Sequence, residues 1–313
     1  MKLVVQIPCL NEAQTLPLVL KTIPKRISGI DEIVVLIIDD GSTDKTVEVA
    51  KKHGVKDFVI HPTTMGLARS FQDGVNYGLE AGADIIVNTD GDNQYPQEKI
   101  TDLVQPILEN RADIVIADRQ TSEIAHFSPV KKFLQKWGSK TVNWAAGTKL
   151  PDAASGFRAY SKNSLLRLNV TTKFSYAMET IIQAGNKNMA IVSVPVTTNP
   201  KTRESRLFKS TGEHVRKSGM AIMRAYLMYR PYAIFATLGT ALFAGGLALF
   251  VRYLVFFLQG SNEAHLQSII LGAVLFTGSF LCFVLGIVSD IIRVNRILLE
   301  DSLEHIKAQR FKK

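Results

Sequence analysis

Cysteine is scarce in this chain: among its 313 residues only Cys9 and Cys282 occur. Two such residues do not make a disulfide framework, and a reducing compartment is compatible with the sequence. Each cysteine is expected to be a small packing residue. A signal peptide is not expected either, because the apolar run near the N-terminus is broken at Pro8.

Acidic residues are outnumbered by basic ones, with 28 Asp and Glu against 37 Lys and Arg and a formal net charge of +9. This excess predicts contact with phosphate groups or with an anionic membrane surface. We expect those phosphates on small molecules and lipids, and we expect no nucleic-acid partner. The length allows one large domain with an appendage, or two modest domains.

Two long runs near the C-terminus contain almost no charge. Residues 231–258 carry only Arg252, and residues 266–292 carry only Asp290. Each run is long enough to cross a bilayer as a helix. The loop between them has one Glu and no Lys or Arg, whereas basic residues flank both runs on the outside. The positive-inside rule therefore predicts a multi-pass protein of the plasma membrane with both termini in the cytoplasm. The alternative is two buried core helices.

The first 200 residues or so alternate between two patterns. Short apolar runs at 3–7, 33–38, 58–60, 85–88 and 114–117 predict strands, and the stretches at 14–26, 43–53, 67–81 and 97–110 between them predict helices. Such alternation is typical of an α/β domain with a mostly parallel sheet. Ligands of these sheets bind beyond the carboxyl ends of the strands. Three polar clusters of this chain stand there: residues 8–12, 39–44 and 90–92.

Asp90 and Asp92 are the most informative of these polar residues. Two carboxylates one residue apart at a strand end repel each other unless a cation lies between them. Oxygen ligands of this kind favour Mg²⁺ or Mn²⁺, which leaves positions open for substrate phosphates. The alternative is a solvated acidic turn. The other two clusters have alternatives as well: residues 40–44 could form a turn and a helix cap, and Asn11 and Glu12 could cap the first helix.

Five motifs in order carry a resemblance to a known family. They read IPCLNE, IIDDGSTDKT, NTDGDNQYP, DIVIADR and DAASGFRAYSK. Together they resemble the family 2 glycosyltransferases, which have the GT-A fold. With the two apolar runs they are similar to the polyprenyl-phosphate glycosyltransferases, a group that includes dolichol-phosphate mannose synthase and the bactoprenol glucosyltransferases. The resemblance covers residues 2–210 by motif and the remainder by architecture only.

The resemblance implies roles on the donor side of the site. The residues that would bind the nucleotide sugar are Pro8, Leu10, Glu12, Asp39, Asp40, Asp90, Gly91, Asp92 and Arg119, with Asp39 or Asp40 lining the nucleotide pocket. The implied metal ligands are Asp90, Asp92 and Gln94, and the metal would be Mg²⁺ or Mn²⁺. Arg119 would contact the donor phosphates or the sugar.

On the acceptor side the resemblance implies that Asp152 lies close to the reacting centre. The catalytic set would be Asp152, Arg119 and Arg206, and the acceptor phosphate would be bound by Ser155, Arg158, Arg203 and Arg206. Two departures concern this loop. Arg203 stands where the family has Gly, and Pro200 stands where it usually has a basic residue. Lys201 and Arg203 are the two candidates for the contact that Pro200 cannot make.

The implied reaction transfers a monosaccharide from a nucleotide sugar to a polyprenyl phosphate, such as undecaprenyl phosphate, by inverting displacement on the cytoplasmic membrane face. A UDP-sugar is the favoured donor and GDP-mannose the alternative. The sequence disfavours two alternative functions. A processive polysaccharide synthase usually carries a Gln/Arg-x-x-Arg-Trp motif and more membrane helices, and this chain has neither. A non-catalytic anchor would have no reason to keep the acidic cluster.

The predicted organisation has four parts. A catalytic domain spans residues 1–209, an amphipathic helix in the headgroup layer 210–230, a membrane hairpin 231–292 and a basic cytoplasmic tail 293–313. A homo-oligomer is compatible with this plan. A second basic and aromatic stretch contains Lys131, Lys132, Trp137, Lys140 and Trp144. These residues either touch the membrane interface or are ordinary surface and core residues.

Overall fold

The computed structural model covers the whole chain and describes residues 1–120, 129–170, 176–200, 219–220, 223, 229, 231–260 and 266–312. The side chains of residues 129–135 are not described. The chain divides into two units, Met1–Ala225 with Leu303–Lys313, and Tyr226–Ser302. The predicted amphipathic helix at 210–230 lies almost wholly outside the described residues.

The first unit contains a seven-stranded sheet in the order β3-β2-β1-β4-β6-β5-β7. The five predicted strands are all present as β1 (Lys2–Cys9), β2 (Glu32–Asp39), β3 (Asp57–Ile60), β4 (Ile85–Asn88) and β5 (Ile114–Asp118). β7 (Ile191–Pro195) pairs with β5 in parallel. β6 (Arg158–Ser161) runs antiparallel to both of its neighbours, β4 and β5. The predicted α/β fold with a mostly parallel sheet is therefore confirmed.

The central strands are buried on both faces, which is why they read as continuous apolar runs. Leu3, Val4, Val5 and Ile7 of β1 have no exposed surface, and neither do Leu36, Ile37 and Ile38 of β2. Helices cover the sheet: α1 (Leu16–Thr22), α2 (Thr46–Lys52), α3 (Leu67–Glu80) and α4 (Ile100–Leu108), which follows the short 3-10 turn η1 (Gln97–Lys99). These match the four predicted helical stretches.

Helix α3 shows why its sequence folds onto the sheet. Its buried side chains include Ala68, Phe71, Val75 and Leu79, spaced three or four residues apart on one face. Gly74 allows the helix to approach β1, because a Cβ atom there would lie 2.4 Å from the side-chain oxygen of Gln6. The middle of α3 therefore packs closely onto β1.

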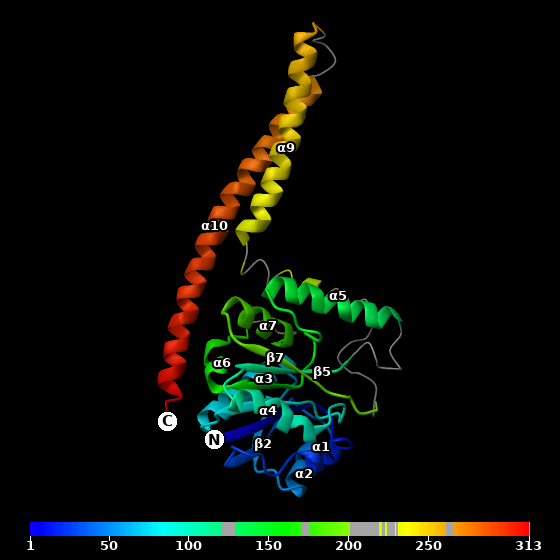
Figure 1. Ribbon diagram of the computed structural model, residues 1–313, viewed down its shortest axis with the longest axis vertical. Helices are drawn as coiled ribbons and strands as arrows, with labels where there is room; N and C mark the ends of the chain where they lie inside the picture. Colours follow the sequence, from blue (N-terminus) through cyan, green and yellow to red (C-terminus); the bar gives the residue numbers. More distant parts are fainter. Residues whose placement is uncertain are drawn as a thin grey trace. The chain divides into compact units, whose positions relative to one another are not determined.

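Three helices of the second half were not predicted: α5 (Pro129–Ala146), α6 (Lys162–Arg167) and α7 (Tyr176–Asn186). Helices α5 and α7 lie side by side (Figure 1), and the Asn186 side chain donates to the carbonyl of Ala145 at 3.3 Å. At Gly185 of α7, a Cβ atom would lie 2.1 Å from the carbonyl oxygen of Ala146. The two backbones are therefore in direct contact.

The second unit is a hairpin of two long helices, α9 (Pro231–Leu258) and the part of α10 (Leu266–Arg310) up to Ser302 (Figure 1). Both are long and apolar enough to cross a membrane, and only 6% and 17% of their most apolar windows are buried. A buried core helix would have most of its surface covered, so the alternative of core helices is disfavoured. Small residues join the two helices: Ser279 donates to the carbonyl of Gly239 at 2.8 Å.

The segment predicted as a basic tail, residues 293–313, is helical as far as Arg310. Its last residues belong to the first unit. There the ammonium group of Lys307 donates to the carbonyl of Leu168 at 2.8 Å and to the side chain of Asn169 at 2.7 Å. Phe311 is buried, with 4% of its surface exposed. The residues of this segment from Leu303 onward therefore pack within the first unit.

Candidate active site

The candidate site lies where β1, β2 and β4 end. The parallel register pairs Cys9 of β1 with Asp39 of β2, and Gln6 of β1 with Asn88 of β4. The loops that follow these strands therefore begin at one edge of the sheet. The three polar clusters predicted from the sequence are brought together there.

The loops after β1 and β2 are tied to each other. The side-chain oxygen of Asn11 accepts from the amide of Thr43 at 2.8 Å, and Ser42 Oγ accepts from the amide of Asn11 at 2.9 Å. Asn11 has a φ of 57°, which this short polar side chain tolerates. The alternative in which these residues only cap helices is not borne out, because neither α1 nor α2 has a side-chain hydrogen bond at its N-cap. The polar side chains join the two loops to each other.

Asp39 and Asp40 have different surroundings. Asp40 accepts from the amides of Met65 at 2.8 Å and Gly66 at 2.9 Å, and its Oδ1 lies 2.8 Å from Nδ1 of His61. Both oxygens of this carboxylate therefore already bind groups of the segment that precedes α3. Asp39 is also buried, but among the described residues its Oδ1 has no hydrogen-bond partner. Since a buried carboxylate oxygen needs a donor, Asp39 is the better candidate for a nucleotide ligand.

Hydrogen bonds hold the acidic loop, residues 90–94, in place. The amide of Gln94 donates to Oδ1 of Asp92 at 3.1 Å. The carbonyls of Gln94 and Asn93 accept from the backbone and side chain of Asn199, at 2.9 Å and 3.0 Å. Thr15 Oγ1 lies 2.8 Å from the carbonyl of Gly91. These contacts hold the two carboxylates of the loop at the end of β4.

Gly91 packs closely against the first loop. A Cβ atom at this position would lie 3.1 Å from Sγ of Cys9 and 3.2 Å from Cγ of Glu12. Glu12 is itself buried, and its Oε2 accepts from Thr15 Oγ1 at 2.8 Å. Pro8, in β1, and Leu10, just after it, are half-buried at the same edge. These predicted donor-side residues therefore lie close together. Glu12 and Gly91 also make packing contacts that hold the two loops against each other.

Arg119 and Asp152 form a bidentate ion pair. Nε of Arg119 donates to Oδ2 at 2.6 Å and Nη2 donates to Oδ1 at 3.0 Å. Burial alone would raise the pKa of Asp152, but the charge and hydrogen bonds of Arg119 outweigh this and lower it. Burial lowers the pKa of Arg119, while the charges of Tyr95, Asp152 and Asp90 raise it, and the net shift is upward. Both groups are therefore fully ionised at neutral pH.

The acceptor-side prediction agrees less well with the structure. Arg158 is fully buried, and its guanidinium donates to the carbonyls of Ser155, Ala177 and Ala153 at 2.7, 2.7 and 3.0 Å. Its nitrogens thus hold the loop before β6, and the predicted contact with an acceptor phosphate is not supported. Ser155 is buried as well. Arg203 and Arg206 lie outside the described residues.

Several neighbours of the site were missed by the sequence reasoning. Tyr95 is buried, and its hydroxyl accepts from the amide of Gly156 at 3.2 Å. The Asn88 side chain donates to the hydroxyl of Tyr176 at 2.8 Å and to the carbonyl of Gly156 at 3.0 Å. Burial and the charge of Asp90 raise the pKa of Tyr176 well above its ordinary value. Tyr95 was within a quoted motif, whereas nothing in the local sequence marks Tyr176.

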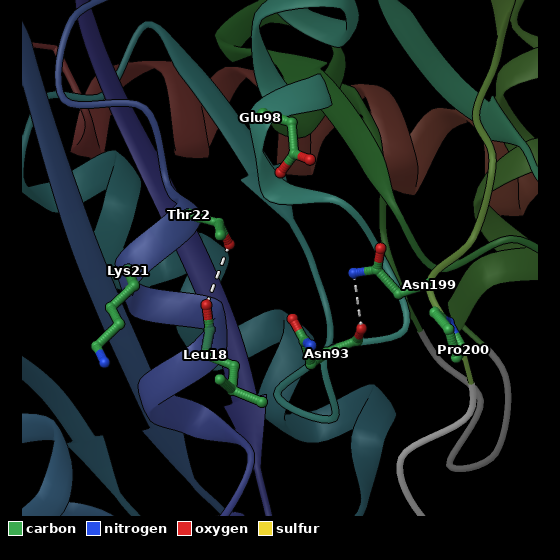
Figure 2. Close-up of a pocket in the computed structure, with 7 residues that line it drawn as sticks. All are labelled: Leu18, Lys21, Thr22, Asn93, Glu98, Asn199 and Pro200. Atoms are coloured by element: carbon green, nitrogen blue, oxygen red, sulfur yellow. Dashed lines mark hydrogen bonds between the residues drawn. The ribbon is translucent and has the colours of Figure 1, made fainter.

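A cavity of about 470 Å³ adjoins the acidic loop on the side of α1 (Figure 2). It is lined by Leu18, Lys21, Thr22, Asn93, Glu98, Asn199 and Pro200. None of these is a predicted ligand, and we assign no substrate to the cavity. Two residues of its wall, Asn199 and Asn93, are joined by a hydrogen bond, which helps to hold the acidic loop in place.

Relatives of known function share parts of this chain. An undecaprenyl-phosphate mannosyltransferase of Micrococcus luteus is 28% identical over 207 residues, which cover 63% of this chain and 83% of that protein. A polyprenol monophosphomannose synthase of Mycolicibacterium smegmatis is 24% identical over 68% of this chain and 82% of its own length. Glycosyltransferase AglJ of Haloferax volcanii is 28% identical over 91% of both chains.

Solved structures show the same fold. Glucosyl-3-phosphoglycerate synthase of Mycobacterium tuberculosis, crystallised with Mn²⁺, UDP-glucose and phosphoglyceric acid, superposes with a TM-score of 0.56 at 19% identity. The superposition covers 72% of this chain and 78% of that one. The sequence profile of glycosyl transferase family 2 matches residues 4–168, more than half of the chain. The chain therefore belongs to glycosyl transferase family 2 and is a glycosyltransferase.

Proposed function

We propose that this glycosyltransferase moves a hexose from a nucleoside diphosphate sugar to a polyprenyl phosphate at the cytoplasmic face of a membrane. One observation carries the proposal: the acidic loop, the buried Asp39 and the Arg119–Asp152 pair meet at one edge of the sheet, in a chain that also has two candidate membrane helices. The names of two relatives, which specify undecaprenyl phosphate and polyprenol monophosphomannose, support the same acceptor class.

A divalent ion fits the donor set of the acidic loop. Asp90 and Asp92 would supply hard oxygen ligands. Among the described residues no group of three or more His, Cys, Asp or Glu side chains is placed to hold a metal ion, so the protein by itself does not complete a site. An ion held by two carboxylates keeps positions for the diphosphate of a donor, as Mg²⁺ and Mn²⁺ sites commonly do. Gln94 remains the predicted third ligand. Bound there, the ion would neutralise charge on the leaving diphosphate.

The chain's own residues would then act as follows. Asp39 would accept a hydrogen bond from the nucleobase or ribose through its unpaired Oδ1. Arg119, oriented by Asp152, would point its remaining donor atoms at the diphosphate or the sugar, where negative charge increases as the bond breaks. The phosphate of the lipid attacks the anomeric carbon from the opposite side, and the bond to the diphosphate oxygen breaks, which inverts the configuration.

No strong general base is needed in this reaction, because a lipid phosphate is already ionised at neutral pH. This agrees with the state of Asp152, whose two oxygens both bind Arg119. We therefore assign Asp152 as a positioning residue for Arg119 and not as a base. The acceptor phosphate would be bound by Arg203 and Arg206, which remain the predicted ligands on that side.

The test uses the full chain in detergent or nanodiscs, with labelled UDP-glucose, UDP-N-acetylglucosamine and GDP-mannose, undecaprenyl phosphate, and Mg²⁺ or Mn²⁺. We expect label in the lipid extract with one donor class, UDP-sugars being the favoured one. Asp92→Asn should abolish this label, whereas Asp102→Asn, an exposed carboxylate of α4, should not. No lipid label from any donor would overturn the proposal.

Membrane topology is tested separately. Reporter fusions after residue 262, between the two candidate spans, and after residue 313 should report opposite sides, with the second in the cytoplasm. Equal signals from both positions would rule out a membrane-crossing hairpin, whatever the transfer assay shows.

A further inference from the structure

One glycine is hydrogen-bonded to both ends of the acidic loop. The carbonyl of Gly156 accepts from the side chain of Asn88 at 3.0 Å, and Asn88 stands two residues before Asp90. The amide of the same glycine donates to the hydroxyl of Tyr95 at 3.2 Å, and Tyr95 directly follows Gln94. The side chains just before and just after the acidic loop are therefore bound to one point of the backbone.

Tyr176 of α7 joins this arrangement. Its hydroxyl accepts from the Asn88 side chain at 2.8 Å and donates to the carbonyl of Gly156 at 3.4 Å. Its ring stacks on Phe71 of α3, with 4.1 Å between the ring centroids, so the direction of the hydroxyl is set by packing. We name Asn88, Tyr95, Gly156 and Tyr176 the Gly156 clamp.

The side chain of Asn88 has a partner for each of its polar atoms. Its amide nitrogen donates to Gly156 and Tyr176, and its oxygen accepts from Nε2 of Gln6 in β1 at 2.9 Å. The reverse orientation would direct the oxygen at the carbonyl of Gly156, so the partners determine which atom lies where. Asn88 has no exposed surface, and a buried side chain that makes all of these hydrogen bonds is held rigidly.

The Gly156 clamp lies against a predicted metal ligand. A Cβ atom at Gly156 would lie 3.4 Å and 3.6 Å from the two carboxylate oxygens of Asp90, and 3.5 Å from the hydroxyl of Tyr176. The backbone of the glycine is therefore next to the Asp90 carboxylate. Asp90 is half-buried, so the clamp covers only part of it.

We propose that the Gly156 clamp positions the metal ligands: it fixes both ends of the acidic loop and so holds Asp90 and Asp92 ready for a divalent ion. The inference rests on the proposed function, because the ion is part of that proposal. Two neighbouring carboxylates repel each other, and a loop that could relax would let them move apart. An ion binds more tightly to a loop that is already fixed, because less conformational freedom is lost on binding.

Two substitutions each remove one hydroxyl from the clamp and leave the aromatic packing in place. Tyr95→Phe keeps the ring beside Phe157, at 5.0 Å between centroids. Tyr176→Phe keeps the stack on Phe71. The matched control is Tyr160→Phe, because the Tyr160 hydroxyl is also buried but has no hydrogen-bond partner among the described residues. The Tyr160 ring belongs to the same aromatic group, 5.6 Å from Phe71.

The probe is Mn²⁺, titrated into the full chain in detergent at one fixed concentration of UDP, with the free ion measured by electron paramagnetic resonance. We expect the dissociation constant for Mn²⁺ to rise about two- to tenfold in each clamp variant, because each loses one hydrogen bond that fixes the loop. Tyr160→Phe should leave this constant unchanged. Melting temperatures without metal are measured in the same samples, since a merely structural role would lower them without changing the affinity for Mn²⁺.

The proposal is wrong if either clamp variant binds Mn²⁺ as tightly as the unchanged protein, or if Tyr160→Phe loses as much affinity as the clamp variants do. If the unchanged protein binds no Mn²⁺, this inference and the metal assignment fail together. The affinity measurement does not use turnover. Mn²⁺ binding without sugar transfer would therefore refute the proposed function, and the affinities of the variants would still decide whether the clamp positions the ligands.

Discussion

The guanidinium of Arg119 binds both oxygens of Asp152, at 2.6 Å and 3.0 Å, and the two side chains are 16% and 3% exposed. Asp152 stands at the start of the motif that resembles the family's acceptor loop, and Arg119 follows β5. The pair therefore joins a residue predicted for the donor side to one predicted for the acceptor side. In this geometry Asp152 orients the guanidinium of Arg119. Both oxygens of Asp152 already accept hydrogen bonds from Arg119, so neither is free to accept a proton.

The first prediction separates these two roles of Asp152. Arg119→Lys keeps the charge but loses the two-point contact, and we expect transfer to fall about 100-fold, the usual cost of losing one preorganised donor. If Asp152 acts only through Arg119, the double variant Arg119→Lys with Asp152→Asn should be no slower than Arg119→Lys alone. Losses in kcat/KM that multiply would instead show an independent catalytic role for Asp152.

The second prediction concerns stability and pH. The pKa of Asp152 is lower in the folded protein than the ordinary value of about 3.9. The group therefore contributes stability that is complete above about pH 4 and is lost as the pH falls below that value. Asp152→Asn should cost about 3 kcal/mol at pH 7, because it leaves a buried arginine without its partner. The difference in unfolding midpoint between the two proteins should narrow in acid.

Asp102→Asn is the control for the comparison of unfolding midpoints. Asp102 is 45% exposed, and its one ion pair with a described residue is to Lys99. Its unfolding midpoint should stay close to that of the unchanged protein at every pH. If the difference in unfolding midpoint between Asp152→Asn and the unchanged protein increased below pH 4, the lowered pKa assigned to Asp152 would be wrong.

The sequence predicted the first half of the fold well for a physical reason. Strands β1 to β5 are apolar runs separated by amphipathic helices, and each strand is recognisable by itself. Strand β6 is different, because its four residues include Arg158 and gain their place only by pairing with β4 and β5 far along the chain. No local pattern signals that pairing. The residues predicted for the donor side lie at one edge of the sheet because they follow recognisable strands.

Two of the predicted ligands have polar atoms that the protein itself already binds. A motif specifies residue types, but not which polar groups the protein itself satisfies. Arg158 and Asp40 were both predicted as ligands, and both are occupied by backbone groups of neighbouring loops. Conversely, Tyr176 reaches the site only because α7 packs on α3, where its ring stacks on Phe71 at 4.1 Å. Such contacts depend on the tertiary structure.

The third prediction uses two glycines in packed helices. Gly185→Ala would place a Cβ atom 2.1 Å from the carbonyl of Ala146, so α5 and α7 must separate, and we expect a loss of at least about 1–3 kcal/mol in unfolding free energy. Gly138→Ala, in α5, meets nothing within 4 Å and should stabilise the protein by about 0.5–1 kcal/mol through helix propensity. Opposite shifts in the melting temperature check both; equal shifts would mean that the two helices do not pack this closely.

The fourth prediction tests the packing of the C-terminal segment. Phe311 is 4% exposed within the first unit, and Phe311→Ala should lower the unfolding free energy of that unit by about 3 kcal/mol. The neighbouring Lys312 is exposed, and Lys312→Ala should change it by less than about 0.5 kcal/mol. Hydrogen exchange of residues 303–312 gives a direct readout. Fast exchange there in the unchanged protein would contradict the packing.

The last prediction concerns the loop that Asp40 holds. Its carboxylate accepts from the amides of Met65 and Gly66 and lies against His61, whose Nε2 is 3.2 Å from Asp73 of α3. We expect this network to position the loop before α3 beside the nucleotide pocket, with Asp39 as the residue that touches the donor. Hydrogen bonds to a charged group are worth about 1.5–3 kcal/mol, so Asp40→Asn should raise the KM for the donor about tenfold.

The same variant should leave kcat nearly unchanged, because Asp40 makes no contact with the reacting atoms in this assignment. His61→Ala should act in the same direction with a smaller effect, whereas His53→Ala, at the exposed end of α2, should have none. Isothermal titration with UDP and with GDP, in parallel with steady-state kinetics, distinguishes weaker donor binding from slower chemistry. A fall in kcat at constant KM would show that Asp40 acts on the transition state. The assignment of Asp40 to loop positioning and of Asp39 to donor contact would then be wrong.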